Sequence, residues 1–324
     1  MSDLALQLIF TLDATLRLST PLILCAMAGL VSERSGIIDI SLEGKLLSAA
    51  FAAAATASLT GSVFQGLLMA MMVSMAMSLI HGFACITHRG NQIISGLAVN
   101  ILASGLTVTI AFAMFRQGGQ TPALGADERF NPITLPLAET LSGVPVLGPI
   151  YAELISGHNL IVYALLIIVP VVSWMLFKTR FGLRLRAVGE KPEAVDTAGI
   201  SVAWVRYRAV LIAGLLCGIA GAYLSTAHGA GFVREMSAGK GYIALAAMIC
   251  GRWRPGAAVL ACLLFGFLEA LSARMEGVEL PLMGVAPSDL LRLLPYIGTV
   301  ILLAGFFGRA VPPAAIGRPY TKER

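Results

Sequence analysis

The sequence predicts an all-α fold: a polytopic transmembrane helical bundle with about nine crossings, one of them short. Of the 324 residues, 57% are hydrophobic and 13% charged, whereas soluble domains carry about 25% charged residues. The mean hydropathy is +0.83. Stretches of about 20 residues with little charge recur along the chain, and a helix of this length crosses the hydrocarbon core of a bilayer. These observations exclude a water-soluble enzyme, and a β-barrel would show shorter, alternating segments.

The predicted crossings begin near the N-terminus. The first apolar stretch, 4–31, carries Asp13 and Arg17 on one helix face, so the span proper is expected from about residue 16 and the stretch 32–36 is expected to end it. The segment 242–251 is apolar but only ten residues long, so it crosses only where its surroundings accommodate it. The other seven predicted spans are 42–59, 63–87, 92–115, 159–177, 209–227, 257–272 and 290–307.

Two long loops set the predicted orientation. Residues 116–157 hold five prolines, with four acidic residues against two basic ones, which is typical of a loop outside the hydrocarbon. Residues 178–208 hold seven Lys or Arg against three acidic residues, and the positive-inside rule places such a loop in the cytoplasm. The chain is thus expected to be a single transmembrane domain, 1–324. Its N-terminus and 116–157 would lie outside, and 178–208 and the C-terminus in the cytoplasm.

The net charge of +5 does not indicate nucleic-acid binding, because the basic residues gather in a few loops, as membrane orientation requires. All five cysteines lie in apolar stretches and are expected to be small core residues. The first basic residue is Arg17, so no cleavable signal peptide is expected. Gly214 and Gly218 form a G-x-x-x-G pattern, which predicts close packing of two helices.

The sequence offers no catalytic constellation. A phosphate-binding loop needs G-x-x-x-x-G-K-[ST], and the nearest match has Arg234 at the first glycine position and Gly241 at the Ser/Thr position. The four histidines are scattered, without metal-ligand spacing. No metal or other cofactor is expected on this chain, so any energy for transport must come from an ion gradient or from a partner protein.

Within the basic loop, residues 189–200 predict a short, largely polar helix. Pro192 suits the first helical turn, Glu193 and Asp196 lie near its positive N-terminal end, and Gly199 is a natural C-terminal stop. Such a helix has little apolar surface to bury against its own chain. It is therefore either an element that contacts another protein or a solvated connector.

Four segments carry a family resemblance. They are GLVSERSGIIDISLEGKLLSAAFAA at 29–53, NQIISGLAVNIL at 91–102, GEKPEAVDTAGI followed by VRYRAVLIAGLLCGIAGAYLS at 189–225, and GKGYIALAAMICGRWRPGAAVLACLLFG at 239–266. In this order they resemble the permeases of ABC importers in the branched-chain amino acid, ribose and nucleoside group. The likeness covers residues 18–308 and is nearest to the shorter of two paired permeases in nucleoside or simple-sugar importers.

The resemblance implies a permease subunit in a bacterial inner membrane that imports solute by alternating access, with a fold similar to the cobalamin-type permeases. The implied partners are a second permease subunit, a cytoplasmic ABC ATPase that holds ATP and Mg, an extracytoplasmic solute-binding protein and the lipid bilayer. The 189–200 helix would dock on the ATPase. The positions that match the family's coupling pattern are Gly189, Glu190, Glu193, Ala194 and Gly199.

Polar residues at the expected membrane depth are candidates for the transport pathway. Amides and hydroxyls suit a neutral, hydroxyl-rich solute such as a nucleoside, because they donate and accept hydrogen bonds without charge. The same groups also serve as contacts between helices, and a carboxylate can serve as a cap. The candidates are Asp39, Glu43, Asn91, Gln92, Ser95 and Asn100.

Asp39 departs from the resemblance, because the nucleoside and sugar subgroup usually has Asn at this position. A carboxylate at membrane depth is costly unless it is paired or hydrated. Asp39 is therefore expected to pair with Arg34 or Lys45, or to lie in a wet cavity. Together with Glu43 it keeps a second function open, that of a secondary transporter driven by a proton or sodium gradient.

Overall fold

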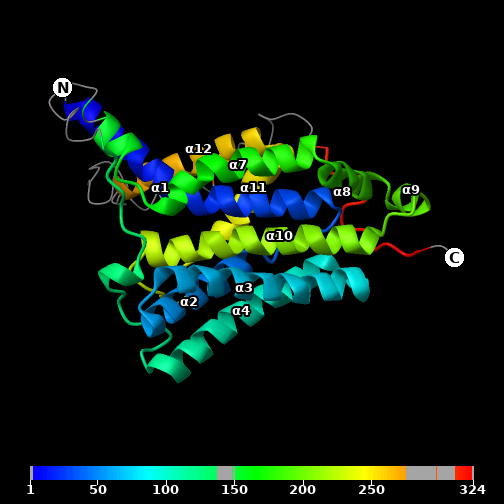
Figure 1. The fold of residues 1–324 in the computed structure, drawn as a ribbon, viewed down its shortest axis with the longest axis horizontal. Coiled ribbons are helices and arrows are strands. Elements are labelled where there is room, and N and C mark those ends of the chain that lie inside the picture. Colours follow the sequence, from blue (N-terminus) through cyan, green and yellow to red (C-terminus); the bar gives the residue numbers. More distant parts are fainter. Residues whose placement is uncertain (1–2, 137–147, 149, 275–296, 298–310, 323–324) are drawn as a thin grey trace.

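The computed structural model describes residues 3–136, 148, 150–274, 297 and 311–322. In this part of the chain the only β-type pairing is an isolated bridge between Ile133 and His158, so the all-α bundle is confirmed (Figure 1). The helices are α1 (Asp3–Arg34), α2 (Leu42–Thr60), α3 (Val63–Gly82), α4 (Gln92–Phe115), α7 (Leu160–Lys178), α8 (Arg180–Glu190), α9 (Pro192–Thr197), α10 (Val202–Tyr223), α11 (Lys240–Cys250) and α12 (Pro255–Arg274).

Among the described residues, six helices are long and apolar enough to cross a membrane: α1, α3, α4, α7, α10 and α12. Two of them continue as π-helical turns, α3 through Phe83–Thr87 and α10 through Leu224–His228. The 19-residue α2 and the 11-residue α11 add two further apolar helices. The last predicted crossing, 290–307, lies outside the described residues, so the count of nine stays a prediction.

Hydropathy located the helices well, and two of the helices begin before the spans predicted within them. α4 spans the predicted 92–115, whereas α1 is one continuous helix from Asp3 to Arg34. α10 begins at Val202, seven residues before its predicted start, because Ser201 Oγ accepts a hydrogen bond from the Trp204 amide at 3.3 Å and caps the helix. The charges of Arg206 and Arg208 had excluded these first turns from the predicted span.

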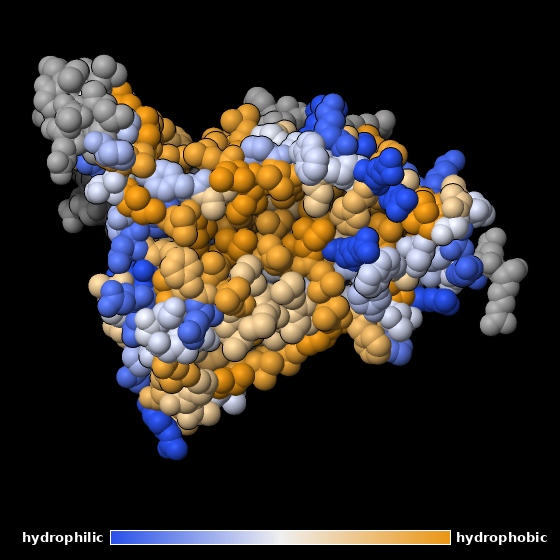
Figure 2. Space-filling view, viewed as in Figure 1, coloured by the Kyte–Doolittle hydropathy of each residue, from blue (hydrophilic) through white to orange (hydrophobic). Residues whose placement is uncertain are grey.

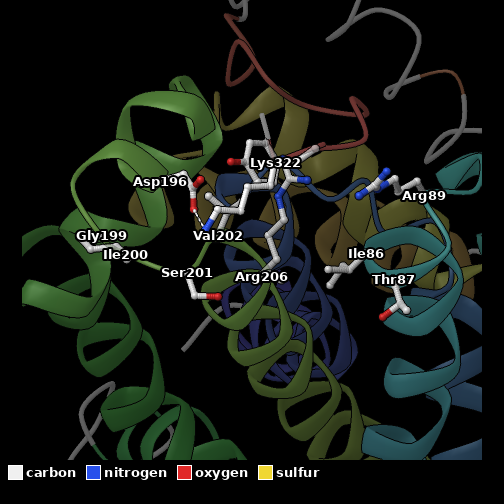
Figure 3. A pocket seen from close by; sticks show the side chains of 12 residues that line it. Ile86, Thr87, Arg89, Asp196, Gly199, Ile200, Ser201, Val202, Arg206 and Lys322 are labelled. Atoms are coloured by element: carbon white, nitrogen blue, oxygen red, sulfur yellow. Dashed lines mark ion pairs between the residues drawn. The ribbon is translucent and has the colours of Figure 1, made fainter. Parts of the chain in front are cut away.

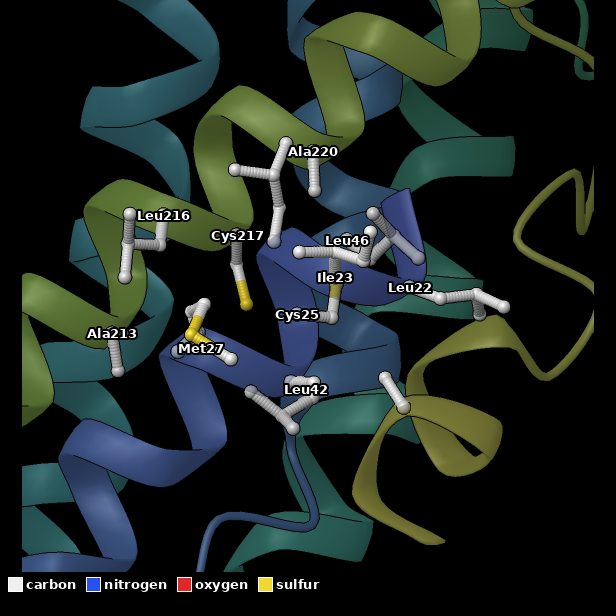
Figure 4. Close-up of a cluster of buried hydrophobic side chains, with 14 of the residues drawn as sticks. Leu22, Ile23, Cys25, Met27, Leu42, Leu46, Ala213, Leu216, Cys217 and Ala220 are labelled. Carbon is white, nitrogen blue, oxygen red and sulfur yellow. The ribbon is translucent and has the colours of Figure 1, made fainter. Parts of the chain in front are cut away.

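α1 and α10 form the centre of the bundle. Of the most apolar 18-residue stretch in each of these two helices, 78% is buried, whereas the share is 28% in α4 and in α7. Figure 4 shows Cys25 and Met27 of α1, Cys217 of α10 and Leu46 of α2 in one cluster of buried side chains. All five cysteines are free and buried, as expected for core residues.

Small residues allow α10 to lie close against α3. A Cβ on Gly218 would lie 2.5 Å from the Met71 Cα, and one on Gly214 would lie 2.9 Å from the Met75 Cα. Real Cβ atoms do not approach so closely, so any larger residue would push the two helices apart. The close packing predicted from the G-x-x-x-G pattern is confirmed.

The outer helices present an apolar surface. Figure 2 shows a broad hydrophobic area between hydrophilic ends. On α7, Leu166 is 76% exposed, and Ile167 and Trp174 are also exposed. Such a surface is stable only against lipid or another apolar partner, in keeping with a multi-pass membrane protein.

Candidate functional site: a membrane-depth junction and a coupling surface

Between α1 and α2 the chain is not helical, over residues 36–41. This segment runs along α4 from Gln92 to Asn100, a distance of about 12 Å at 1.5 Å per residue. Midway, a Cβ on Gly96 would lie 3.1 Å from the Ile40 Cβ, so the segment packs directly on α4. The first residues of α2 thus lie well inside the bundle. Non-helical backbone at membrane depth needs polar partners from the protein.

Side chains of α3 and α4 supply such partners. Gln92 Oε1 accepts a hydrogen bond from the Ile38 amide at 2.7 Å. His81 Nε2 lies 2.9 Å from the Ile38 carbonyl oxygen, and its Nδ1 lies 3.0 Å from Ser95 Oγ. Ser95 therefore orients the imidazole, which in turn holds the Ile38 carbonyl.

Asn100 joins three elements. Its Oδ1 accepts from the Gly44 amide at 2.8 Å, in the first turn of α2. Its Nδ2 donates to the Ile40 carbonyl at 3.0 Å and to the Tyr242 hydroxyl of α11 at 2.9 Å. This one amide satisfies an otherwise unpaired helix-start donor and ties α2 and α11 to α4.

Asp39 forms a buried ion pair with Lys45. The Lys45 ammonium lies 2.8 Å from Oδ1 and 2.6 Å from Oδ2, and both side chains are 0% exposed. Ser41 Oγ donates to Oδ1 at 2.5 Å. Of the expected arrangements, pairing with Lys45 is confirmed. Arg34 instead donates to the Trp253 carbonyl oxygen at 2.8 Å.

Glu43 caps the short helix α11. Its Oε1 accepts from the Gly239 amide at 2.8 Å and its Oε2 from the Gly241 amide at 2.7 Å. A Cβ on Gly241 would lie 2.5 Å from the Glu43 backbone nitrogen, so only glycine allows this approach. A carboxylate at a helix N-terminus is stabilised by the free amides and by the helix dipole. The start of α11 and the start of α2 therefore meet inside the bundle.

The polar surface helix lies at one end of the molecule. Figure 1 shows α8 and α9 together at one end of the molecule, with α9 beyond the ends of α1 and α10. Pro192 occupies the first position of α9, as predicted, and is buried with Val195. Gly199 follows α9 with φ +79°, a conformation that favours glycine. The exposed positions in this part of the chain include Glu190, Glu193, Ala194 and Gly199.

Gly189 is the buried member of the predicted coupling set. A Cβ there would collide with the Arg34 carbonyl oxygen, at the end of α1. The C-terminal tail covers the same place: Ala315 N donates to the Gly189 carbonyl at 2.8 Å, and Gly317 N donates to the Gly36 carbonyl at 3.0 Å. The surface helices are thus linked through α1 and the tail to the 36–41 segment.

A cavity of about 340 Å³ lies beside α9 (Figure 3). Asp196 and Gly199 border it on the α9 side, and Arg89 borders it on the other. Lys322 Nζ lies 3.8 Å from Asp196 Oδ1. The buried Arg206 reaches from α10 toward this region and donates to the Ser35 carbonyl at 3.2 Å. Charged and apolar side chains both line this cavity.

Comparisons with known proteins decide the family. The family described as "Branched-chain amino acid transport system / permease component" matches residues 11–303. The chain belongs to this family. The guanosine ABC transporter permease protein of Bacillus subtilis is 38% identical to this chain, over 99% of each of the two chains. The nucleoside ABC transporter permease protein of Lactococcus lactis subsp. cremoris is 37% identical, over 94% of this chain and 95% of that one. A putative glucose ABC transporter permease protein of Haloferax volcanii is 31% identical, over 96% and 97%.

Membership makes the chain a permease component of a multi-pass inner-membrane transport system and not an enzyme. It also speaks against an independent secondary transporter. Within the described residues, no group of three or more His, Cys, Asp and Glu side chains is placed to hold a metal ion.

The structure gathers most of the predicted pathway residues at one place. Asp39, Glu43, Gln92, Ser95 and Asn100 all bond within the junction of 36–45, α3, α4 and α11. The contribution of these five residues to the transport pathway stays a prediction, and so does that of Asn91.

Asn91 is the exception. It lies at the exposed end of α4 and caps it, accepting from the Ile93 amide at 2.9 Å. His81 and Tyr242 belong to the junction and were missed by sequence reasoning. A lone histidine and a lone tyrosine in apolar helices carry no spacing signal that marks them.

Proposed function

We propose that this permease carries nucleosides into the cell as one subunit of an ATP-driven ABC importer. The observation that carries the proposal is the similarity, over nearly the whole chain, to a guanosine permease and to a nucleoside permease. The more distant putative glucose permease makes a sugar the second candidate solute.

The permease works with partners that supply energy and solute. A cytoplasmic ATPase binds ATP and Mg, a second permease subunit completes the membrane part, and an extracytoplasmic binding protein delivers the solute. The basic residues of 178–208 orient α8 and α9 toward the cytoplasm. The N-terminus and 116–157 then lie outside, and the C-terminus lies inside.

Coupling begins at the exposed face of α9. Glu190, Glu193, Ala194 and Gly199 contact the ATPase, while the buried Gly189 holds α8 against the end of α1. Closure of the ATPases moves α8 and α9, and the tight contacts at Gly189 pass this movement to α1 and to the 36–41 segment. Close-packed elements with little free space transmit displacement in this way.

The test is transport by the complete importer in proteoliposomes. Vesicles that contain this permease with its second permease and ATPase, together with the binding protein, should take up labelled guanosine only with ATP. Uptake of glucose in place of guanosine would favour the sugar alternative. Uptake by the isolated chain under a proton or sodium gradient would refute the importer. Affinity purification from native membranes should recover the ATPase and the second permease.

A further inference from the structure

A partly exposed polar group lies near the middle of α4. Ser104 is close to the midpoint of this 24-residue helix, and its hydroxyl donates a short hydrogen bond to Glu235 Oε1. Glu235 belongs to the stretch between α10 and α11 and is exposed. Tyr242, in the first turn of α11, is 43% exposed. At 1.5 Å per residue, Ser104 lies about 18 Å from the start of α4, about half-way across a bilayer.

The Glu235 carboxylate is unsuited to face lipid. The adjacent Arg234 is exposed and, within the described residues, forms no ion pair with Glu235. The Lys240 ammonium pairs with Glu269 at 2.6 Å. Among the described residues, Glu235 forms no ion pair and has only the Ser104 hydroxyl as a side-chain partner. A charge exposed to hydrocarbon is strongly unfavourable, and such residues face water-filled cavities or other protein. This face of α4 and α11 is therefore expected to lie against water or another protein, not against lipid.

The Tyr242 ring is held in place at the edge of the same face. Its hydroxyl accepts the hydrogen bond from Asn100 Nδ2 at 2.9 Å, which fixes one end of the ring and leaves 43% of the residue exposed. Glu43 anchors the backbone of the same turn through the Gly241 amide. A fixed aromatic face next to a hydrogen-bond acceptor is the chemistry that suits a planar base joined to a hydroxylated sugar.

We propose that Ser104, Glu235 and Tyr242 line the translocation path and contact the nucleoside. The base stacks on the Tyr242 ring, which gives affinity with little dependence on the identity of the base. Glu235 accepts hydrogen bonds from sugar hydroxyls. The choice of a nucleoside as the solute rests on the proposed function. The exposure of this face to water does not.

Thiol labelling tests the exposure. The five native cysteines are at most 3% exposed. They should therefore not react, and any labelling of this chain reports on the introduced cysteine. Ser104→Cys should react with a charged, membrane-impermeant methanethiosulfonate in the assembled importer, because the reactive thiolate forms only in contact with water. Leu166→Cys is the control, since this 76% exposed residue lies on the apolar surface of α7. Equal failure of both variants to react would overturn the aqueous face.

Solute protection tests the contact. Guanosine should slow the labelling of Ser104→Cys several-fold in vesicles where the wild-type importer carries guanosine. Labelling that guanosine leaves unchanged in such vesicles would overturn the contact. Failure of the wild-type importer to carry guanosine would instead refute the proposed function, and the labelling rate would still report on the aqueous face.

Transport by ring variants tests stacking. Tyr242→Ala should raise the KM for guanosine about tenfold, which lies within the range measured for loss of a base–aromatic stack. Tyr242→Phe keeps the ring and should retain most of the affinity, and Leu166→Ala should match the wild type. Equal KM values for Tyr242→Ala and Tyr242→Phe would refute the stacking role. Binding of guanosine to the separate binding protein should not change in any variant.

Discussion

Replacing Asp39 by asparagine, the residue that the family resemblance leads one to expect here, should destabilise the permease by about 3–5 kcal/mol. The Lys45 ammonium lies 2.6 Å from the carboxylate, and neither side chain is exposed. At an effective dielectric of about 20, this attraction is about 6 kcal/mol. The asparagine carbonyl would keep one hydrogen bond to the ammonium, but the charge would remain buried and unpaired. Breaking one side of a buried pair typically costs about 3–5 kcal/mol.

A matched double variant separates charge from shape. Asp39→Asn together with Lys45→Met removes both charges and should recover most of the lost stability, because no unpaired ion remains. Unfolding in mixed detergent micelles gives the free energies, and ATP-dependent uptake in proteoliposomes shows whether the charge itself serves transport. Two results would refute the reasoning: a single variant within about 1 kcal/mol of the wild type, or a double variant no more stable than the single one.

Three further variants address the cap and the coupling surface. Glu43→Ala should remove both hydrogen bonds from the α11 amides and lower the free energy of unfolding by about 3 kcal/mol. Glu43→Gln should lower it less. Equal free energies of unfolding for the two variants would contradict the capping role. Gly199→Ala should weaken stimulation of the ATPase by solute. It should also lower the free energy of unfolding by about 1 kcal/mol, because φ is +79° at this position. The control is Gly256→Ala, since a Cβ there would meet open space. Glu190→Ala should leave the chain folded but lower the uptake per ATP hydrolysed, and an unchanged ratio of uptake to hydrolysis would count against docking through this face.

The helices were predictable because long apolar runs have one structural solution in a membrane. α4 and the proline start of α9 followed from hydropathy and from capping chemistry alone. The start of α10 did not, because Arg206 lowers the local hydropathy although the folded protein buries it. Hydropathy averages over a window and takes no account of a partner such as the Ser35 carbonyl, which lies far away in sequence.

The polar junction was predictable only as a set of residues. Sequence reasoning selected Gln92 and Asn100 for their polarity at membrane depth. Their partners are backbone groups of Ile38 and Ile40, and a backbone group has no sequence signature. For Glu43 the sequence allowed either a position that lines the pathway or a capping role. Its capping hydrogen bonds depend on where the 229–239 stretch returns into the bundle. Such pairings come from the fold as a whole.

The reliance of residues 36–41 on distant side chains has a consequence for biogenesis. Gln92 and Asn100 follow their partners by 54 and 60 residues. At about 5–20 residues per second of synthesis, they arrive about 3–12 s later. During that interval the backbone of 36–41 would meet lipid without hydrogen-bond partners. The α1–α2 pair is therefore expected to stay in the aqueous interior of the insertion machinery until α4 emerges, so the first helices of this protein enter the membrane as a group.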